Sequence, residues 1–369
     1  MLNKNTPPMQ ASLALAREAL FTTSPNPRVG CVLTSAAGEI IGLGSTQAVG
    51  GPHAEIMALR DAAAKGRSVK GATAWVTLEP CCHHGRTGPC CDALIAAGIK
   101  KVVASMTDPN TLISGQGFER LRAAGIEVEV GPGAAESREL NIGFFSRMVR
   151  KTPWVRMKIA SSLDGTTALV SGHSQWITSP AARADGHVWR ARACAVLTGI
   201  GTVLKDDPQL DVRLIKTPRQ PGRIIVDSRL QTPPGAAIFK TGGPVWIYCA
   251  VRDAAKEAAL TAQGATVTCL PDGHGQVNLI AMMKDLGKRE INELHVESGS
   301  RLNGALIRDK LVDEFLIYLA PKLMGPGRGM AAFGPLQSLS GAVQLQFQST
   351  EQVGADLRVI ARVSGRNWF

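Results

Sequence analysis

Apolar and polar positions along the first 130 residues alternate between helical and strand periods. Helical spacing predicts helices at residues 10–21 and 53–64, and a shorter one at 90–97 that Gly98 ends. Runs rich in apolar and β-branched residues predict strands at 29–33, 40–43, 72–78 and 101–105. Because helices and strands alternate, we expect an α/β domain with helices packed on a largely parallel sheet.

A second series of elements begins after a segment that runs from 131–133 to 151–153 and has glycine or proline at both ends. We expect this segment to be a domain junction, with one domain at 1–150 and another at 151–369. The second domain also has an α/β pattern. Its elements are strands 154–160, 194–199, 222–226, 245–249 and 293–297, a helix near 180–193, and strand-rich stretches at 311–321 and 343–363 that finish as an antiparallel pair.

Composition narrows the class of protein. Of the 369 residues, 44% are hydrophobic, yet there is no run of 18 apolar residues, and the opening MLNKNTPPMQ lacks an apolar signal core. We therefore expect a soluble cytoplasmic protein without a membrane partner. Four of the eight cysteines fall within 81–91, which favours metal chemistry in a reducing compartment over a disulfide framework.

The net charge of +11 divides into +3 for residues 1–150 and +8 for residues 151–369. A basic second half suits anionic small molecules or nucleic acid, and charge alone does not separate them. The chain has no Lys/Arg run and no interleaving of basic and aromatic residues. We therefore expect a phosphorylated small molecule and no nucleic acid as the partner.

The clearest chemical signal is a set of zinc-type ligands, His53 together with Cys81 and Cys90, each cysteine preceded by a proline. One imidazole and two thiolates leave a tetrahedral Zn²⁺ with an open fourth position for water. The metal lowers the pKa of that water to about 7. Glu55 follows His53 by two residues, as in zinc hydrolytic deaminases, where the glutamate carries a proton and does not bind the metal.

Alternatives to catalytic zinc are a structural zinc knot, with His83 or His84 as fourth ligand, and core cysteines without metal. A structural site has no use for the carboxylate of Glu55. The cysteines occur as the adjacent pairs 81–82 and 90–91, and the preceding proline favours the first of each pair. The loop between the pairs carries His83, His84 and Arg86, donors suited to a polar or phosphorylated substrate.

Residues two apart do not meet across a helix surface. His53 and Glu55 can therefore converge only at a metal that lies end-on at the first turn. This predicts that the helix begins at or just before His53.

In the second half, Gly199-Ile200-Gly201 follows a strand, but Leu204 breaks the dinucleotide-binding fingerprint. The segment 297–305 follows a strand and opens a helix. Backbone N–H groups at such a helix start can bind an anion, for example a cofactor phosphate, although a plain strand-to-helix turn has the same pattern.

Ordered motifs over nearly the whole chain resemble the bifunctional bacterial riboflavin-pathway enzymes, in which a pyrimidine deaminase is fused to a 5-amino-6-(5-phosphoribosylamino)uracil reductase. In the first half the resemblance rests on residues 25–30, 53–55, 81–90 and 108–110. In the second half it rests on 158–165, 174–178, 201–208, 226–228 and 297–305. The resemblance implies a cytidine-deaminase-like α/β/α domain followed by a dihydrofolate-reductase-like α/β domain that uses NADPH.

The family's residue roles carry over to matching positions. They imply zinc ligands at His53, Cys81 and Cys90, and the proton carrier at Glu55. Contacts to the aminopyrimidine fall on Asn26 and on the loop between the cysteine pairs, where Arg86 is available to the substrate's phosphate. The implied NADPH contacts are Ala160, Trp176, Thr202, Asp206, Ser228, Gly299, Ser300, Arg301, Leu302, Asn303, Gly304 and Ala305. The implied substrate contacts in the reductase are Ser174, Arg190, Leu210, Arg213 and Glu297.

Several of these positions also have plainer interpretations. Arginines such as Arg190 and Arg213 can grip a phosphate in bidentate fashion, but each alone is more often a solvated surface residue. Trp176 alone favours a core position, and Asp206-Asp207-Pro208 could be a simple turn.

The chain departs from the family pattern in two places. Residues 111–117 read TLISGQG where the family usually has PLVAGKG, and Cys82 replaces a more usual serine.

The resemblance implies two steps on one intermediate. A diaminopyrimidinone ribosyl phosphate loses ammonia, and NADPH then reduces the ribosyl group to a ribityl chain. Family members are commonly homo-oligomers. The alternatives are a nucleic-acid deaminase with an accessory domain, and a zinc-stabilised binding protein that is not an enzyme.

Overall fold

The computed structural model describes residues 6–83, 88–111, 113–367 and 369. The chain forms two compact units, one ending at Arg150 and the other beginning at Lys151, and Phe369 packs with the first. Within the described residues, no helix combines the length and apolar character needed to cross a membrane.

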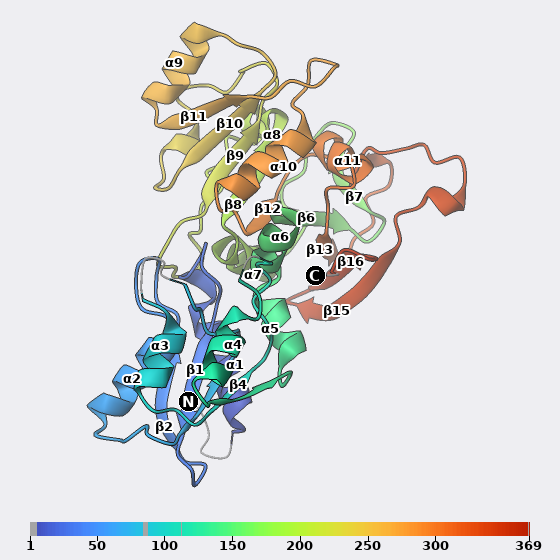
Figure 1. Ribbon diagram of the computed structural model, residues 1–369. Helices are drawn as coiled ribbons and strands as arrows, with labels where there is room; N and C mark the ends of the chain where they lie inside the picture. Colours follow the sequence, from blue (N-terminus) through green and yellow to red (C-terminus); the bar gives the residue numbers. More distant parts are fainter. Residues whose placement is uncertain (1–5, 84–87, 112, 368) are drawn as a thin grey trace. The chain divides into compact units, whose positions relative to one another are not determined.

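The first unit is built on a five-stranded sheet of order β2-β1-β3-β4-β5 (Figure 1). Its elements are α1 (Pro8–Glu18), η1 (Ala19–Phe21), β1 (Gly30–Thr34), β2 (Ile40–Ser45), α2 (Ala54–Ala64), β3 (Thr73–Val76), α3 (Cys90–Ala96), β4 (Lys101–Ala104), α4 (Gln116–Ala123), β5 (Glu127–Val130), α5 (Ala134–Leu140) and α6 (Ile142–Arg150). The predicted helices and strands are all present. Two differences concern their arrangement.

The first difference is the sheet, which is mixed instead of largely parallel. β1 runs antiparallel to both β2 and β3, and only β3, β4 and β5 are mutually parallel. The cause is the tight turn between β1 and β2, since parallel neighbours would need a longer crossover. The second difference concerns the segment 131–153, which was expected to be a domain junction. The helices α5 and α6 occupy most of it.

The second unit is built on a nine-stranded sheet of order β11-β10-β9-β8-β12-β6-β13-β16-β15. Its strands are parallel except for β16, which is antiparallel to both β13 and β15. Its elements are β6 (Trp154–Ser162), β7 (Thr166–Leu169), α7 (Pro180–Arg192), β8 (Ala195–Gly199), α8 (Ile200–Asp206), β9 (Gly222–Val226), η2 (Ala237–Phe239), β10 (Val245–Cys249), α9 (Ala254–Ala262), β11 (Ala265–Cys269), α10 (Leu279–Lys288), β12 (Glu293–Val296), α11 (Ser300–Arg308), β13 (Glu314–Ala320), β14 (Gly327–Gly329), η3 (Leu339–Gly341), β15 (Leu345–Val353) and β16 (Asp356–Val363).

The two faces of the central strands of this sheet differ in chemistry. On β6, Val155, Met157 and Ile159 point into an aliphatic core that includes residues of α10 and α11. The intervening residues Arg156 and Lys158 occupy the opposite face, as the strand period of two requires.

A ladder of buried charges crosses that opposite face. Arg156 donates to Glu293 of β12 at 3.0 Å and to Glu314 of β13 at 2.5 Å. Arg192 of α7 pairs with Glu293 at 2.8 Å, and Arg362 of β16 pairs with Glu314 at 2.8 Å. Arg156 and both glutamates are only 1% exposed. Pairing of every charge makes this burial tolerable.

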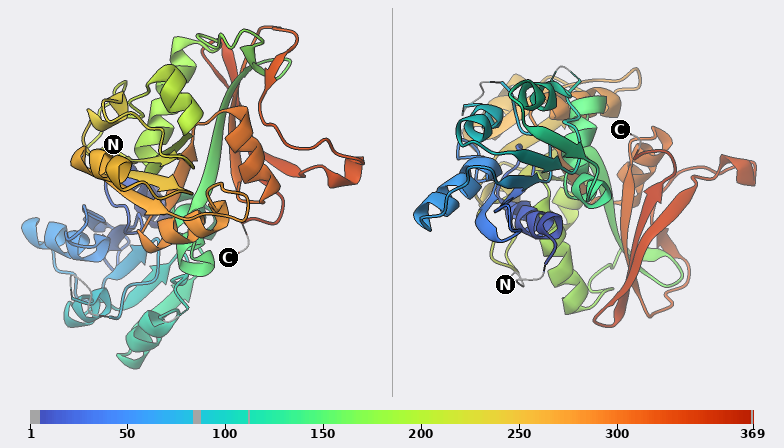
Figure 2. Two further views of the ribbon diagram at one scale, coloured as in Figure 1. Left: turned by 90° about the horizontal axis from the view of Figure 1, so that it is seen from above. Right: turned by 60° about the horizontal axis from the view of Figure 1, so that its bottom comes forward.

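Part of the second unit is exposed although it is apolar. The segment 322–347, which we call the apolar arm, runs from the end of β13 into the first residues of β15, and its part around η3 extends away from the sheet of its unit (Figure 2). Its exposed apolar side chains are Leu323, Phe333, Leu336, Leu339, Val343, Leu345 and Phe347. Its last three residues begin β15, the outermost strand at that end of the sheet.

The close approach of α1 to β1 generates a stability prediction. A Cβ at Gly30 would lie 1.9 Å from the backbone oxygen of Ser12, so Gly30→Ala forces the helix away from the sheet. We expect a loss of about 1–3 kcal/mol, measured as a lower midpoint of the first unit's thermal transition. Gly186→Ala is the control, because a methyl group there meets nothing within 4 Å. Equal melting of both variants would contradict the packing argument.

Candidate active sites

Three segments of the first unit bring His53, Cys81 and Cys90 together. His53 is the N-cap residue of α2, with an extended backbone. Cys81 follows the buried stretch after β3, and Cys90 is the first residue of α3, preceded by the extended Pro89. Two of the three residues therefore lie at helix N-termini, where the partial positive charge of the helix favours thiolate.

The distances among the three side chains fit a zinc ion. The Nδ1 atom of His53 lies 3.5 Å from Sγ of Cys81 and 3.3 Å from Sγ of Cys90. All three ligand atoms lie within 4.8 Å of one another. Tetrahedral zinc, with bonds of about 2.3 Å to sulfur and about 2.0 Å to nitrogen, separates those atoms by about 3.5 Å. The donor set and its spacing therefore suit this metal.

Glu55 reaches the same cluster because His53 lies outside the helix proper. The helix begins at Ala54, one residue later than expected, so His53 is the N-cap residue and its extended backbone does not follow the helical path. The Glu55 side chain is 4% exposed and hydrogen-bonds with Cys90. The metal ligands and the carboxylate are thus brought together at the end of α2.

Neighbouring groups shift the proton affinities of the cluster. The hydrogen bond with Cys90, reinforced by His53, lowers the pKa of the Cys81 thiol to about 4 against the effect of burial. The same contact raises the pKa of Cys90. Burial, with the charge of Cys81, raises the pKa of Glu55 to about 7. A pKa near 7 suits a carboxyl group that takes up and gives back a proton at neutral pH.

The second cysteine of each pair is engaged elsewhere. The Cys91 thiol is buried and donates to the backbone oxygens of Pro80 at 3.1 Å and Gly117 at 3.5 Å. The Cys82 thiol contacts Oε1 of Gln116 at 3.8 Å. These contacts support the preference for Cys81 and Cys90.

Sequence reasoning missed Glu79, which anchors the loop beside the cluster. Its buried carboxylate accepts backbone N–H bonds from Asp108 at 2.9 Å, Gly115 at 3.0 Å and Gly117 at 2.8 Å. The altered segment 111–117 is tied down by two of these bonds. An acidic residue at the end of a buried strand is the signal that could have revealed this role.

Of the two substrate contacts expected in the first unit, the structure describes only Asn26. Asn26 lies in the loop before β1, half-buried, and its N–H donates to the backbone oxygen of Thr23 at 2.8 Å. Arg86 falls outside the described residues.

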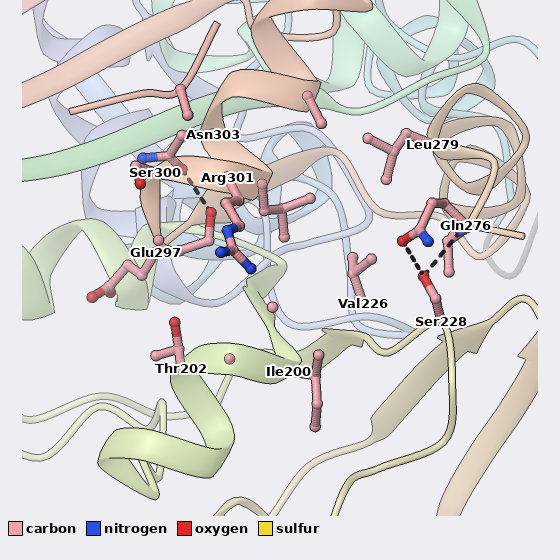
Figure 3. Close-up of a pocket in the computed structure, with 18 of the residues that line it drawn as sticks. Ile200, Thr202, Val226, Ser228, Gln276, Leu279, Glu297, Ser300, Arg301 and Asn303 are labelled. Atoms are coloured by element: carbon pink, nitrogen blue, oxygen red, sulfur yellow. Dashed lines mark hydrogen bonds between the residues drawn. The ribbon is translucent and has the colours of Figure 1, made fainter. Parts of the chain in front are cut away.

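The second unit contains a pocket of about 1630 Å³ at the carboxyl ends of β8, β9 and β12. Figure 3 shows Arg301 between Glu297 on one side and Ser228 with Gln276 on the other. Most of the expected NADPH contacts line this pocket: Ala160, Thr202, Asp206, Ser228, Gly299, Ser300, Arg301, Leu302, Asn303 and Ala305. Ser174 and Glu297, expected to contact the substrate, line it as well.

Helix starts and short contacts shape the pocket wall. Segment 297–305 leaves β12 and enters α11 at Ser300, as its pattern predicts. Oγ of Ser298 donates to Oδ1 of Asn303 at 2.6 Å, which fixes the turn before the helix. On the other side, Oγ of Ser228 contacts Gln276 and accepts from the N–H of Val277, both at 3.2 Å (Figure 3).

Two expected NADPH contacts do not line the pocket. Gly304 is buried in α11, and a Cβ there would lie 2.0 Å from the backbone oxygen of Ala332, so its role in the structure is close packing. Trp176 is 64% exposed, with the Arg183 guanidinium stacked over its ring at 4.4 Å. The core position that Trp176 alone favours is therefore wrong.

A cluster of charged groups lies at the Glu297 end of the pocket. Arg190 binds the Glu297 carboxylate in bidentate fashion, with Nε 2.5 Å from Oε1 and Nη2 3.0 Å from Oε2. Nζ of Lys158 lies 3.8 Å from Oε2 of the same carboxylate. Burial alone would raise the pKa of Glu297, but Arg190 and Lys158 hold that pKa well below its usual range. Burial also lowers the pKa of Lys158. Lys158 was missed as a site residue, although a lysine inside a largely buried strand is a signal for one.

The remaining expected substrate contacts, Arg190, Leu210 and Arg213, do not line the pocket, although Arg190 is linked to it through Glu297. Arg190 also donates to the backbone oxygen of Asp211 at 2.9 Å, so its donors already have protein partners and it is not a solvated surface residue. Arg213 contacts the Asp211 carboxylate at 2.6 Å while its side chain stays 53% exposed, so it can still bind an anion. Leu210 is buried, with a left-handed backbone.

Two family models match separate parts of the chain. Residues 3–106 match the model described as the cytidine and deoxycytidylate deaminase zinc-binding region, and residues 153–359 match the RibD C-terminal domain. The chain is 45% identical to the riboflavin biosynthesis protein RibD of Escherichia coli (strain K12), over 95% of this chain and 96% of that protein. It is 42% identical to RibD of Aquifex aeolicus (strain VF5), over 95% and 96%.

Two solved structures are similar over nearly their full length. Acinetobacter baumannii RibD (form 2) has a TM-score of 0.87 and 38% identity, with coverage of 96% of this chain and 98% of that one. The Thermotoga maritima diaminohydroxyphosphoribosylaminopyrimidine deaminase/5-amino-6-(5-phosphoribosylamino)uracil reductase has a TM-score of 0.86 and 34% identity, with coverage of 96% and 97%. Together with the family models, these matches confirm the predicted fold class.

The adjacent cysteines allow a sharp test of the ligand set. Cys81→Ser removes a thiolate from the cluster, so we expect the purified protein to lose most of its zinc, measured by elemental analysis after gel filtration. Cys82→Ser is the matched control and should keep its zinc, because that thiol faces Gln116. Zinc retained by the first variant and lost by the second would reverse the assignment.

Proposed function

The chain belongs to the RibD family of riboflavin biosynthesis proteins, and we propose that each of its units carries out one of two successive reactions on the same phosphorylated pyrimidine. The first reaction deaminates 2,5-diamino-6-ribosylamino-4(3H)-pyrimidinone 5′-phosphate. The second uses NADPH to reduce the ribosyl group and gives 5-amino-6-(5-phosphoribitylamino)uracil. The observation that carries the proposal is the cluster of His53, Cys81 and Cys90 beside the buried Glu55.

In the deaminase unit, His53, Cys81 and Cys90 would hold the metal. Zinc, when bound, supplies a water of lowered pKa as the nucleophile. Glu55 takes a proton from that water on its carboxylate and delivers it to the departing amine nitrogen, which leaves as ammonia. Burial excludes competing water from Glu55, and Asn26 and Arg86 would orient the pyrimidine and its phosphate.

In the reductase unit, the pocket at the strand ends would bind NADPH, which supplies the hydride. The backbone N–H groups at the start of α11, around Gly299 and Ser300, suit the cofactor phosphates. The proposed contacts are Ala160, Trp176, Thr202, Asp206, Ser228 and residues 299–305. The proposal is supported by the fact that most of these residues line one pocket. Trp176 and Gly304 do not line it.

The charged end of that pocket would receive the sugar phosphate. Glu297 is held in one orientation by Arg190, so it can accept a hydrogen bond from a sugar hydroxyl without reorganising. Arg213 has a largely exposed guanidinium and suits the phosphate. Ser174 and Leu210 complete the proposed substrate contacts, and Lys158 joins them through its position beside Glu297.

The alternative function, a nucleic-acid deaminase with an accessory domain, has no support in the second unit. That unit matches the RibD C-terminal domain over residues 153–359. A phosphorylated small molecule also accounts for the basic charge. All eight cysteines are free, which supports the proposal that the enzyme works in the reducing cytoplasm.

We also propose that the enzyme is a homo-oligomer, with the apolar arm as its interface. Leu339 is 91% exposed and Phe347 is 77% exposed. Exposed apolar clusters of this kind mark interaction surfaces. The adjoining strand β15 has an open edge that offers backbone hydrogen bonds to a second copy.

The deaminase assignment is tested by Glu55→Gln. Loss of the proton carrier should slow ammonia release on the diaminopyrimidinone phosphate by about 100-fold or more. Zinc content, and NADPH oxidation on the already deaminated substrate, should both stay at wild-type levels. Glu127→Gln is the control, because this glutamate is exposed and its carboxylate pairs with Lys101 on the surface of the sheet. Ammonia release by Glu55→Gln at a rate near that of the wild type would show that Glu55 is not the proton carrier.

The interface proposal is tested by Phe347→Asp. A charge in an apolar interface should shift the molar mass measured by light scattering after gel filtration from the oligomer towards the monomer. Val170→Asp, at another strongly exposed apolar residue outside the arm, should leave the mass unchanged. A wild-type chain that is already monomeric would refute the proposal.

A further inference from the structure

Two cysteines lie side by side at the ends of neighbouring strands in the reductase unit. Cys249 is the last residue of β10 and Cys269 is the last residue of β11. They are register partners in a parallel pair, so their side chains point to the same face of the sheet. Both are free thiols; Cys249 is buried and Cys269 is half-buried.

The positions of this pair satisfy the requirements for a disulfide. Adjacent strands lie about 4.7–4.9 Å apart, within the range of about 4.4–6.8 Å between Cα atoms that disulfides span. The Cys249 thiol already reaches the neighbouring strand, where it donates to the backbone oxygen of Thr268, the residue before Cys269, at 3.7 Å. Burial and then the charge of Cys269 raise the pKa of Cys249 to about 12. Because β11 is the outermost strand of the sheet, it can shift to reach disulfide geometry without displacing another strand.

The pair is connected to the wall of the proposed NADPH pocket by short backbone contacts. The N–H of Leu270 donates to the oxygen of Cys249 at 2.8 Å, and Asn278 donates to the oxygen of Leu270 at 2.8 Å. Ala250, which follows Cys249, donates to the oxygen of Ser228 at 3.0 Å. Asn278 and Ser228 line the pocket. A shift of either strand end therefore moves the pocket wall.

We propose that Cys249 and Cys269 form a reversible disulfide when the protein meets a peroxide, and that this bond weakens NADPH binding. The inference rests on the proposed NADPH site. The more accessible Cys269 is oxidised first, its sulfur taking one oxygen from hydrogen peroxide to give a sulfenic acid and releasing one water. The Cys249 thiol then attacks that sulfur, forms the S–S bond and releases a second water. Two thiols and one peroxide thus yield one disulfide and two waters.

Such a bond fits the redox setting of the enzyme. Disulfides in a reducing compartment are transient, and thiols restore the reduced pair by exchange. The reductase consumes NADPH, so its loss of affinity during peroxide stress would spare the reductant that peroxide-removing reactions need.

Cys194 provides an internal comparison. It precedes β8, which runs parallel to β9, and β9 is parallel to β10, so Cys194 lies at the amino edge of the sheet, away from the pocket. Its Sγ accepts the N–H of Asn292 at 3.3 Å. Oxidation of Cys194 should therefore leave NADPH binding unchanged.

The test uses the full chain with its zinc, titrated with NADPH before and after treatment with hydrogen peroxide. After alkylation of the remaining thiols and digestion, mass spectrometry should reveal the peptides containing 249 and 269 joined, lighter than the dithiol by two hydrogen atoms. The dissociation constant for NADPH should rise several-fold and return to its first value with dithiothreitol. Cys269→Ser should keep its affinity after peroxide, whereas Cys194→Ser should respond as the wild type does.

Three outcomes would overturn the inference: no linkage between 249 and 269, a linkage with unchanged NADPH affinity, or an equal loss of affinity in Cys269→Ser. The proposed function is judged separately, by NADPH binding to the untreated chain. If the untreated chain does not bind NADPH, the cofactor assignment fails and the effect on affinity falls with it.

Discussion

The first unit depends on one coordination requirement, which is that an imidazole and two thiolates must lie within a few ångströms of each other and beside a carboxylate. Three separate segments meet this requirement: the N-cap of α2, the stretch after β3 and the first residue of α3. Much of the surrounding structure serves to hold these segments. Cys91 fastens α3 to the backbone of Pro80, and Glu79 ties the loop 108–117 to the same corner. The site is therefore positioned by buried polar contacts as well as by the aliphatic core.

The zinc cluster could be predicted from sequence because its chemistry is local and unusual. His53, Glu55, Cys81 and Cys90 are residue types that few structural roles require in that order. Strands such as β9 and β10 were also predictable, since continuous apolar runs between turn residues define their ends. Sheet topology was less accessible. The antiparallel pairing of β1 with β3 joins segments about 40 residues apart, and no local pattern encodes it.

The details of the reductase pocket were hardest to predict for the same reason. Arg190 is committed to Glu297, 107 positions away, so its pairing could not be seen from its neighbours in the chain. The exposure of Trp176 likewise depends on packing that composition does not reveal. The family resemblance supplied residue identities that the pocket largely brings together, but it did not indicate that Glu297 is fixed in place by a guanidinium and an ammonium group.

The charge ladder on the sheet of the second unit has a consequence for how this sequence can change over time. In it, three arginines, Arg156, Arg192 and Arg362, pair with the carboxylates of Glu293 and Glu314, and Arg156 and both glutamates are almost fully buried. Replacing one member leaves its partner's charge buried and unpaired, which costs about 3–5 kcal/mol of stability. Replacing a matched set by apolar residues can leave stability unchanged. These five positions should therefore covary among homologues. They should also be substituted together, and more slowly than the aliphatic positions on the other face of the same strands.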